Sequence, residues 1–148
     1  MANIKDPKWQ QRFIELSVIF SEYSKDPSTR VGAVIVTESC KIVGQGYNGL
    51  LPGIADELLQ LGREFKIDNT AHAEANAFTD NTTHTNEDLY LFVSKPICLE
   101  CAKLAALNKI KGVFCLTTTD PTFNKRWNND RAQMVLANTN ITYTEITN

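Results

Sequence analysis

Two short segments of the chain contain the side chains best suited to chemistry. His72 and Glu74 lie in the first, and Cys98 and Cys101 lie in the second. A Cys-x-x-Cys pair that opens a helix brings two sulfurs to one metal ion, and a distant histidine supplies a third ligand. Three protein ligands leave the fourth tetrahedral position to water, which is typical of a catalytic zinc. The pattern predicts one catalytic Zn²⁺ per chain, with Glu74 placed to move protons without being a ligand.

Two other interpretations of the cysteine pair are weaker. A redox pair does not need the His-x-Glu segment, and a closed structural zinc site needs a fourth ligand. The candidates for that ligand are Cys40, His84 and Cys115. We interpret Cys40 as a turn residue, His84 as a solvated loop residue and Cys115 as a small apolar core residue. Both metal-binding segments are expected at helix N-termini, whose positive ends favour thiolates.

The elements that position these residues follow from periodicity and from the turn residues. An N-cap aspartate followed by proline predicts that the first helix begins near residue 7. We expect helices over 7–24, 55–65, 71–79, 98–109 and 126–138, and strands over 31–36, 41–47, 89–93, 113–117 and 141–146. This order predicts an α/β domain with a mixed sheet whose last three strands are parallel. We expect one domain over residues 1–148.

Composition limits the partners. The chain has 148 residues, 43% of them apolar and 22% charged, and a formal net charge of −2. No segment has the roughly 20 apolar residues that span a bilayer, so we expect a cytoplasmic protein with reduced cysteines and no membrane partner. The acidic balance argues against a nucleic-acid partner, whereas a small phosphorylated substrate needs only one or two cations.

The motifs together resemble one family over nearly the whole length. They are residues 25–36 (KDPSTRVGAVIV), 46–53 (GYNGLLPG), 72–77 (HAEANA), the Cys-Ala-Lys at 101–103, 109–113 and Arg126-Trp127. The zinc motif resembles that of the nucleobase deaminases, and the whole set resembles the deoxycytidylate (dCMP) deaminases. One departure is Ile97, where the family has a proline before the first cysteine. The resemblance implies a three-layer α/β/α fold with a central five-stranded mixed sheet.

The resemblance also implies the reaction and several contacts. Water activated by the zinc would attack C4 of dCMP, giving dUMP and ammonia and so supplying dUMP for thymidylate synthesis, with Glu74 transferring the protons. Asn48, Asn76 and the backbone N–H of Ala73 would contact the substrate. Asn48 is also explained by the turn that Asn-Gly favours. The phosphate needs a cation, for which Arg30 beside Ser28 and Thr29 is the first candidate, and Lys125 with Arg126 the second.

Regulation and assembly are expectations from the family alone. Its members commonly form homohexamers that dCTP activates and dTTP inhibits, which implies Mg²⁺ with a dCTP effector. By this resemblance Tyr47, Gly49 and Gly53 would take part in effector binding. Some members hold a second, structural zinc, but residues 50–71 contain neither cysteine nor histidine, which again predicts one zinc.

Three alternative functions remain at this stage. A tRNA adenosine deaminase shares the zinc motif but is expected to have a basic face. A deaminase of single-stranded DNA needs cationic channels with stacking aromatics, whereas Trp9 and Trp127 are interpreted as packing residues. A non-catalytic nucleotide-sensing module would keep the zinc but has no use for a proton carrier at Glu74.

Overall fold

A five-stranded mixed sheet forms the centre of the protein. The computed structural model describes residues 1–81 and 85–147, so the prediction for His84 lies outside the described residues. The strand order is β2-β1-β5-β6-β7. β1 is antiparallel to both β2 and β5, and β5, β6 and β7 are parallel. The bounds are β1 Gly32–Thr37, β2 Ile42–Tyr47, β5 Leu89–Val93, β6 Gly112–Leu116 and β7 Thr142–Ile146.

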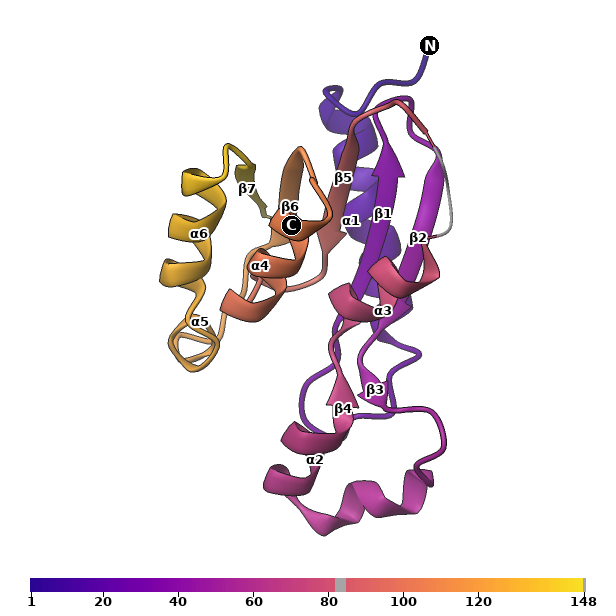
Figure 1. The fold of residues 1–148 in the computed structure, drawn as a ribbon, viewed down its shortest axis with the longest axis vertical. Helices are drawn as coiled ribbons and strands as arrows, with labels where there is room; N and C mark the ends of the chain where they lie inside the picture. Colours follow the sequence, from indigo (N-terminus) through magenta and orange to yellow (C-terminus); the bar gives the residue numbers. More distant parts are fainter. Residues whose placement is uncertain (82–84, 148) are drawn as a thin grey trace.

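Helices cover both faces of this sheet (Figure 1). α1 (Pro7–Ser21) packs on one face, chiefly against β1 and β5. The other face carries α3 (Ala73–Asp80) over β1 and β2, and α4 (Leu99–Leu107) next to α6 (Asn129–Asn138). This arrangement confirms the expected three-layer α/β/α fold. No helix in the described part of the chain has the length and apolar character needed to cross a membrane.

Alternation along the central strands divides the apolar core into two layers. In β1, Ala33 and Ile35 face the side of α3 and α4, whereas Val34 and Val36 face α1. All four side chains are fully buried. Because successive residues of a strand point to opposite faces, this continuous apolar run is what a strand covered on both sides requires.

The boundaries of several helices differ from the sequence-based prediction. α1 begins as expected, with the Asp6 carboxylate accepting from the Lys8 N–H at 2.9 Å, but it ends at Ser21 and not at residue 24. The predicted helix over 55–65 is two elements, the 3₁₀ helix η1 (Asp56–Leu61) and α2 (Arg63–Asn69). They meet at Gly62, whose φ of 102° no ordinary helical residue adopts.

The last predicted helix is also divided. α5 (Phe123–Arg126) precedes α6, and Asn128 between them has the left-handed φ of 56°. α3 begins at Ala73 and not at residue 71, because Thr70–Ala71 forms the short strand β4, paired with β3 (Gly49–Leu50). This two-stranded pairing has no counterpart in the sequence-based prediction.

Residues 49–71 form an arm that projects away from the sheet (Figure 1). It comprises β3, η1, α2 and β4, and it has no buried residue. Two ion pairs tie it to the segment after α1: Lys66 to Asp26 at 3.1 Å and Lys25 to Asp56 at 2.6 Å. The first pair is mostly shielded from solvent and the second is exposed, so the Lys66 pair contributes more to holding the arm.

Candidate metal centre

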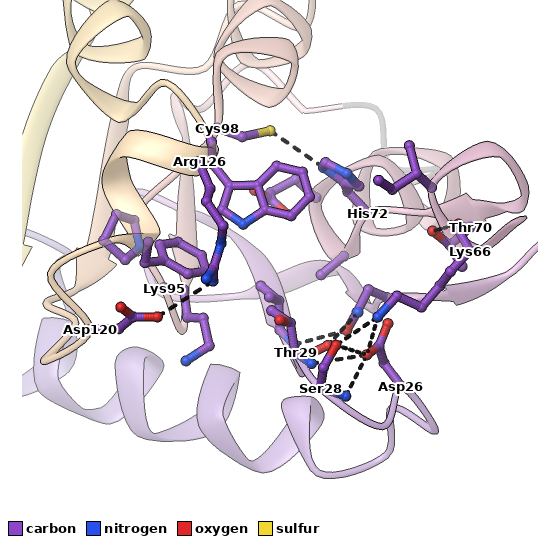
Figure 2. A pocket seen from close by; sticks show the side chains of 18 of the residues that line it. Asp26, Ser28, Thr29, Lys66, Thr70, His72, Lys95, Cys98, Asp120 and Arg126 are labelled. Atoms are coloured by element: carbon purple, nitrogen blue, oxygen red, sulfur yellow. Dashed lines mark hydrogen bonds and ion pairs between the residues drawn. The ribbon is translucent and has the colours of Figure 1, made fainter. Parts of the chain in front are cut away.

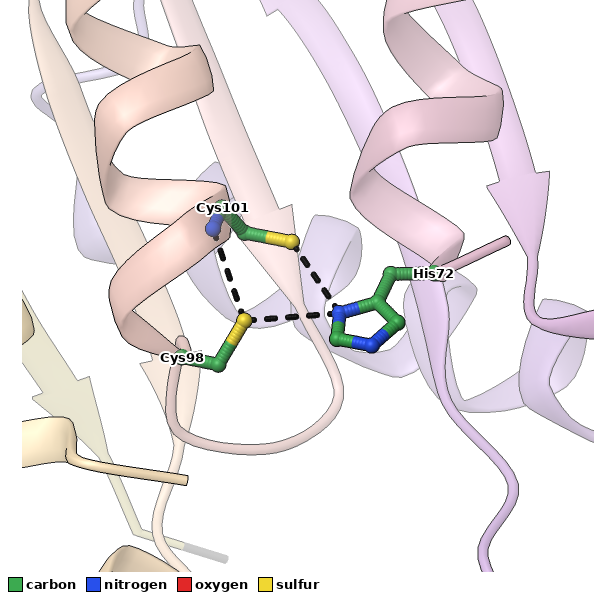
Figure 3. Close-up of side chains that lie close together, drawn as sticks. All are labelled: His72, Cys98 and Cys101. Atoms are coloured by element: carbon green, nitrogen blue, oxygen red, sulfur yellow. Dashed lines mark hydrogen bonds between the residues drawn. The ribbon is translucent and has the colours of Figure 1, made fainter. Parts of the chain in front are cut away.

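Three ligand atoms meet between α3 and α4 (Figure 3). His72 is the N-cap residue of α3, and Cys98 is the N-cap residue of α4. The Nδ1 of His72 lies 3.4 Å from the Cys98 Sγ and 3.3 Å from the Cys101 Sγ. The Cys101 N–H donates to the Cys98 Sγ at 3.4 Å, which fixes the first sulfur at the helix end. The predicted ligand set is therefore brought together.

The geometry fits a zinc ion. With ordinary Zn–N and Zn–S bonds, a tetrahedral site separates a nitrogen from a sulfur ligand by about 3.6 Å. All three ligand atoms lie within 4.8 Å of one another. Within residues 1–81 and 85–147 no other group of three His, Cys, Asp or Glu side chains gathers in this way. The expected single metal site per chain thus has one candidate in the described residues, and neither Cys40 nor Cys115 belongs to it.

The three candidate ligands shift one another's pKa values. The Cys98 pKa is lowered to about 4, mainly because its sulfur accepts a hydrogen bond from the Cys101 thiol and also from His72. The His72 pKa is raised to about 9, chiefly by its hydrogen bond to Cys98, which outweighs the effect of burial. The pKa of Cys101 is raised by its hydrogen bond to the Cys98 thiolate and by burial. Since ligands bind in the deprotonated form, metal affinity falls as pH falls.

Glu74 lies in the first turn of α3, beside this triangle. Its side chain is only 4% exposed. Burial raises its pKa to about 7, the negative Cys98 sulfur adds to the effect, and the positive His72 ring opposes it. A carboxyl group with a pKa near neutrality both accepts and releases protons readily. The position predicted for a proton carrier therefore has the electrostatics that this role needs.

Two glycines in β2 bring α3 close to the sheet. A Cβ on Gly46 would lie 2.6 Å from both the Ala73 carbonyl oxygen and the Ala77 nitrogen. A Cβ on Gly44 would lie 2.6 Å from the Ala77 carbonyl oxygen. The absence of side chains at both positions thus sets the height of α3 above β2. It thereby sets the position of His72 and Glu74 at the start of the helix.

A cavity of about 340 Å³ opens beside the metal triangle. Its volume is within the range of small-molecule sites. Figure 2 shows His72 and Cys98 on one side, Lys95, Asp120 and Arg126 on a second, and Asp26, Ser28, Thr29 and Lys66 on a third. Glu74 and Ala73 also line it. The cavity therefore gives a ligand access to the metal ligands and to the buried carboxyl group.

Aromatic side chains form part of the wall. The Trp127 ring stands edge-on to the His72 ring, with centroids 5.5 Å apart, and Phe123 lies 6.4 Å from Trp127. Both residues line the cavity. Trp127 packs against the apolar core, as predicted, and it also lines the cavity next to His72. Trp9 packs too, stacking on Phe13 with centroids 6.0 Å apart.

The residues predicted to contact the substrate divide into two groups. Ala73 and Asn48 line the cavity. Asn48 also holds the loop before β1, since its Oδ1 accepts from the Val31 N–H and its Nδ2 donates to the Thr29 carbonyl, both at 2.8 Å. Asn76 does not line the cavity, and its Nδ2 donates to the Tyr47 carbonyl at 2.8 Å. Asn76 thus braces the end of β2.

The two predicted phosphate groups also differ in position. Ser28 lines the cavity, but Arg30 does not, and its Nε donates to the Asp26 carbonyl at 3.2 Å. Of the second pair, Arg126 lines the cavity and Lys125 does not. Three further cations that the sequence did not predict line the cavity, namely Arg63, Lys66 and Lys95. For Lys95 the sequence did contain one indication, because this residue directly precedes Pro96 in the loop that leads to the predicted ligand Cys98.

The residues predicted for effector binding lie near a second, smaller hollow of about 190 Å³. Tyr47 and Gly49 line it, together with Tyr23, Lys25 and Asp56. Tyr47 contacts Tyr23 with ring centroids 6.0 Å apart. Gly53 does not line this hollow and adopts a left-handed φ of 93° in the arm.

Residues 7–117 match the model of the cytidine and deoxycytidylate deaminase zinc-binding region. The chain belongs to this family. The matched segment contains the metal triangle, Glu74 and the arm. The family's zinc-binding region therefore includes the triangle of His72, Cys98 and Cys101.

Named relatives of this deaminase family agree with the match. The chain is 37% identical over 116 residues to the deoxycytidylate deaminase of Mus musculus, covering 74% of this chain and 65% of the relative. It is 35% identical to a probable deoxycytidylate deaminase of Caenorhabditis elegans, covering 78% and 60%. It spans less than two thirds of the length of these animal relatives. An uncharacterized deaminase of Aliivibrio fischeri is 37% identical, covering 81% and 80%.

Solved structures of deaminases share the fold. The dCMP deaminase of cyanophage S-TIM5 in complex with dCMP and dUMP superimposes with a TM-score of 0.73 at 20% identity, covering 95% of this chain and 98% of that one. The Aspergillus oryzae Rib2 deaminase superimposes with a TM-score of 0.65 at 14% identity, covering 95% and 85%. At such identities the likeness establishes the architecture of the deaminase family here.

Proposed function

We propose that this protein is a zinc-dependent deaminase that hydrolyses dCMP to dUMP and ammonia. One observation carries the proposal. A buried carboxyl group, Glu74, lines the same cavity as His72 and Cys98, two of the three residues of the ligand triangle that Cys101 completes. The named relatives support the choice of dCMP, since those of Mus musculus and Caenorhabditis elegans are a deoxycytidylate deaminase and a probable one.

The residues of the chain have distinct tasks in this reaction. His72, Cys98 and Cys101 would hold the zinc ion, which when bound would lower the pKa of a water molecule towards neutrality. Glu74 would take one proton from water and place it on N3 of the pyrimidine, and would then take the second proton, from the hydroxyl formed on C4, and deliver it to the leaving amine. The reaction balances as dCMP plus water giving dUMP plus ammonia. The Ala73 N–H, at the start of α3, has no acceptor within its own helix and is available to the base.

Charge in the cavity supports a phosphorylated substrate. Four cationic side chains line it, Arg63, Lys66, Lys95 and Arg126, against the carboxylates of Asp26, Asp120 and Glu74. The chain as a whole has a net charge of −2. A cationic excess inside an acidic protein attracts a small anion more specifically than a polyanion. This favours a nucleotide monophosphate over a nucleic acid.

The proposal extends to the regulation of the enzyme, its oligomeric state and its location in the cell. We propose that dCTP with Mg²⁺ activates the enzyme and dTTP inhibits it through the hollow lined by Tyr47 and Gly49. The arm over residues 49–71 has no buried residue, which supports a homohexamer in which other copies cover it. We further propose one domain over 1–148, a cytoplasmic setting and a role in supplying dUMP for thymidylate synthesis.

The deciding experiment measures ammonia release from dCMP, CMP, deoxycytidine and dCTP, each with and without added dCTP and Mg²⁺. The preparation must contain one zinc per chain, and products are identified by chromatography. We expect rapid conversion of dCMP, faster with dCTP. Conversion of none of the four would overturn the proposal and direct the search to a modified pyrimidine nucleotide or to a nucleic acid.

A further inference from the structure

The cations of the cavity are not equivalent, because some already have partners. Lys66 donates to the Asp26 Oδ1 at 3.1 Å and to the Ser28 Oγ at 2.6 Å, and its side chain is 18% exposed. The backbone N–H groups of Ser28 and Thr29 also donate to the Asp26 Oδ1, each at 2.9 Å. On this side of the cavity the hydrogen-bond donors are thus already engaged by the Asp26 carboxylate.

Asp26 makes the Lys66 side a poor place for a phosphate. Its side chain is 6% exposed. Burial alone would raise its pKa, but the hydrogen bonds from Thr29, Ser28 and Lys66 lower the pKa overall, so the carboxylate is charged at neutral pH. A phosphate placed here would face this charge at short range. The Lys66–Asp26 pair therefore joins the arm to the segment after α1, and it leaves little net positive charge to attract an anion.

The opposite side of the cavity has an unpaired cation. Among the described residues, Lys95 has neither a hydrogen-bond acceptor nor a carboxylate partner within ion-pair distance. Its Nζ lies 5.6 Å from the centre of the Phe123 ring. Three N–H donors on a half-buried ammonium group are therefore free. Asp120 attracts Lys95 electrostatically, but its side chain is 44% exposed, against 6% for Asp26, so solvent screens this attraction and a bound anion would gain more from Lys95.

Arg126 lies beside the same ring and is only loosely paired. Its guanidinium carbon is 5.8 Å from the Phe123 centroid. Its contact with Asp120 is 3.5 Å long, and its contact with the Thr122 hydroxyl is 3.3 Å. Two cations thus lie beside the Phe123 ring, the compact ammonium group of Lys95 and the planar guanidinium group of Arg126. This combination suits the several oxygens of a phosphate.

We propose that Lys95 and Arg126, arranged around Phe123, bind the phosphate of the nucleotide and so make the enzyme select nucleotides over nucleosides. The inference rests on the proposed deamination of dCMP. Lys95 is the second residue after β5 and belongs to the loop that leads to Cys98 (Figure 2). One loop therefore positions both a metal ligand and a phosphate ligand, while Lys66 with Asp26 holds the arm.

The test compares single methionine substitutions, which remove the charge and keep most of the apolar stem. Lys95→Met and Arg126→Met are each expected to raise the KM for dCMP about 10- to 100-fold, the range of one lost charge-assisted hydrogen bond. We expect kcat to change by less than threefold. Lys95→Arg should restore most of the affinity. Lys103→Met is the matched control, because Lys103 lies on the exposed side of α4, paired with Glu100 at 3.1 Å.

Two further variants separate phosphate binding from support of the arm. Lys66→Met should lower the midpoint temperature of unfolding, because it leaves the Asp26 carboxylate buried without its cation, whereas Lys95→Met should not. Arg63, exposed on the arm, also lines the cavity. The inference is overturned if Arg63→Met or Lys66→Met, in folded protein, raises the KM and Lys95→Met does not.

Binding of dUMP and of deoxyuridine, measured by calorimetry on the zinc-loaded protein, separates this inference from the proposed function. We expect Lys95→Met to weaken dUMP binding at least tenfold and to leave deoxyuridine binding unchanged. A wild type that binds dUMP through Lys95 but does not convert dCMP would refute the deaminase and retain the phosphate site. Equal loss for both ligands would refute the phosphate role of Lys95.

Discussion

Glu74 and Glu100 show how burial separates two glutamates near the same metal site. Both lie in the first turn of a helix whose N-cap is a metal ligand. Glu74 is 4% exposed, while the Glu100 side chain is 75% exposed and paired with Lys103. Burial raises the pKa of Glu74 to about 7. The difference in burial therefore favours Glu74 over Glu100 as the proposed proton carrier.

Glu74→Gln tests that assignment. We expect kcat for ammonia release to fall about 10²- to 10⁴-fold, the usual contribution of a positioned proton carrier. Zinc content, measured by atomic absorption, should stay at one per chain because the carboxylate is not a ligand. Glu100→Gln is the matched control and should keep both. A Glu74→Gln protein with most of its turnover would exclude the role, and one without zinc would make Glu74 part of the metal site.

Residues that lie in short sequence motifs could be predicted from the sequence, whereas residues that only the folded chain brings together could not. His72, Glu74, Cys98 and Cys101 lie in two short motifs, so sequence alone was enough to select them as candidates. Lys66 and Lys95 reach the same cavity from distant segments, and no spacing relates them.

At the scale of elements, the central sheet follows from its apolar runs, whereas the arm does not. Buried strands such as β1 and β5 are easy to recognise in the sequence, because a strand that is covered on both faces has a continuous run of apolar residues. β3 and β4 have two residues each, with no burial pattern to reveal them. The divided helices are set by backbone conformation at Gly62 and Asn128. For asparagine that conformation depends on the surrounding fold as much as on residue type.

Gly46→Ala tests how α3 is positioned. The added Cβ would lie 2.6 Å from two backbone atoms of α3, so the helix must move away from β2. We expect a loss of roughly 1 to 3 kcal/mol in the free energy of unfolding, typical of overpacking, measured by urea denaturation. Zinc affinity should fall too, because His72 moves with the helix. Gly49→Ala is the control for stability, since nothing lies within 4 Å of its added Cβ. Equal stabilities for the two variants would refute the tight contact.

At the scale of the whole molecule, the metal triangle joins two parts of one layer. α3 rests on β1 and β2, and α4 rests beside α6 near the other end of the sheet. The two helices contact each other only slightly. His72 from one side and the two cysteines from the other are therefore the main polar link between them. An ion held there would restrain the relative position of both parts.

Removal of zinc should therefore destabilise the whole molecule and not the site alone. A ligand present at 100 times its dissociation constant adds about 2.7 kcal/mol to the folded state, which corresponds to a shift of roughly 5 to 11 °C in a protein of this size. We expect a chelator to lower the midpoint of thermal unfolding by at least this amount, and added zinc to restore it. The shift should shrink as pH falls, because protons compete for His72, Cys98 and Cys101. Cys101→Ser should show the lowered midpoint and no response to chelator, whereas Cys40→Ser, outside the triangle, should respond like the wild type. If the chelator removed the metal without changing the midpoint, α3 and α4 would be held by apolar packing alone, and the zinc would serve chemistry only.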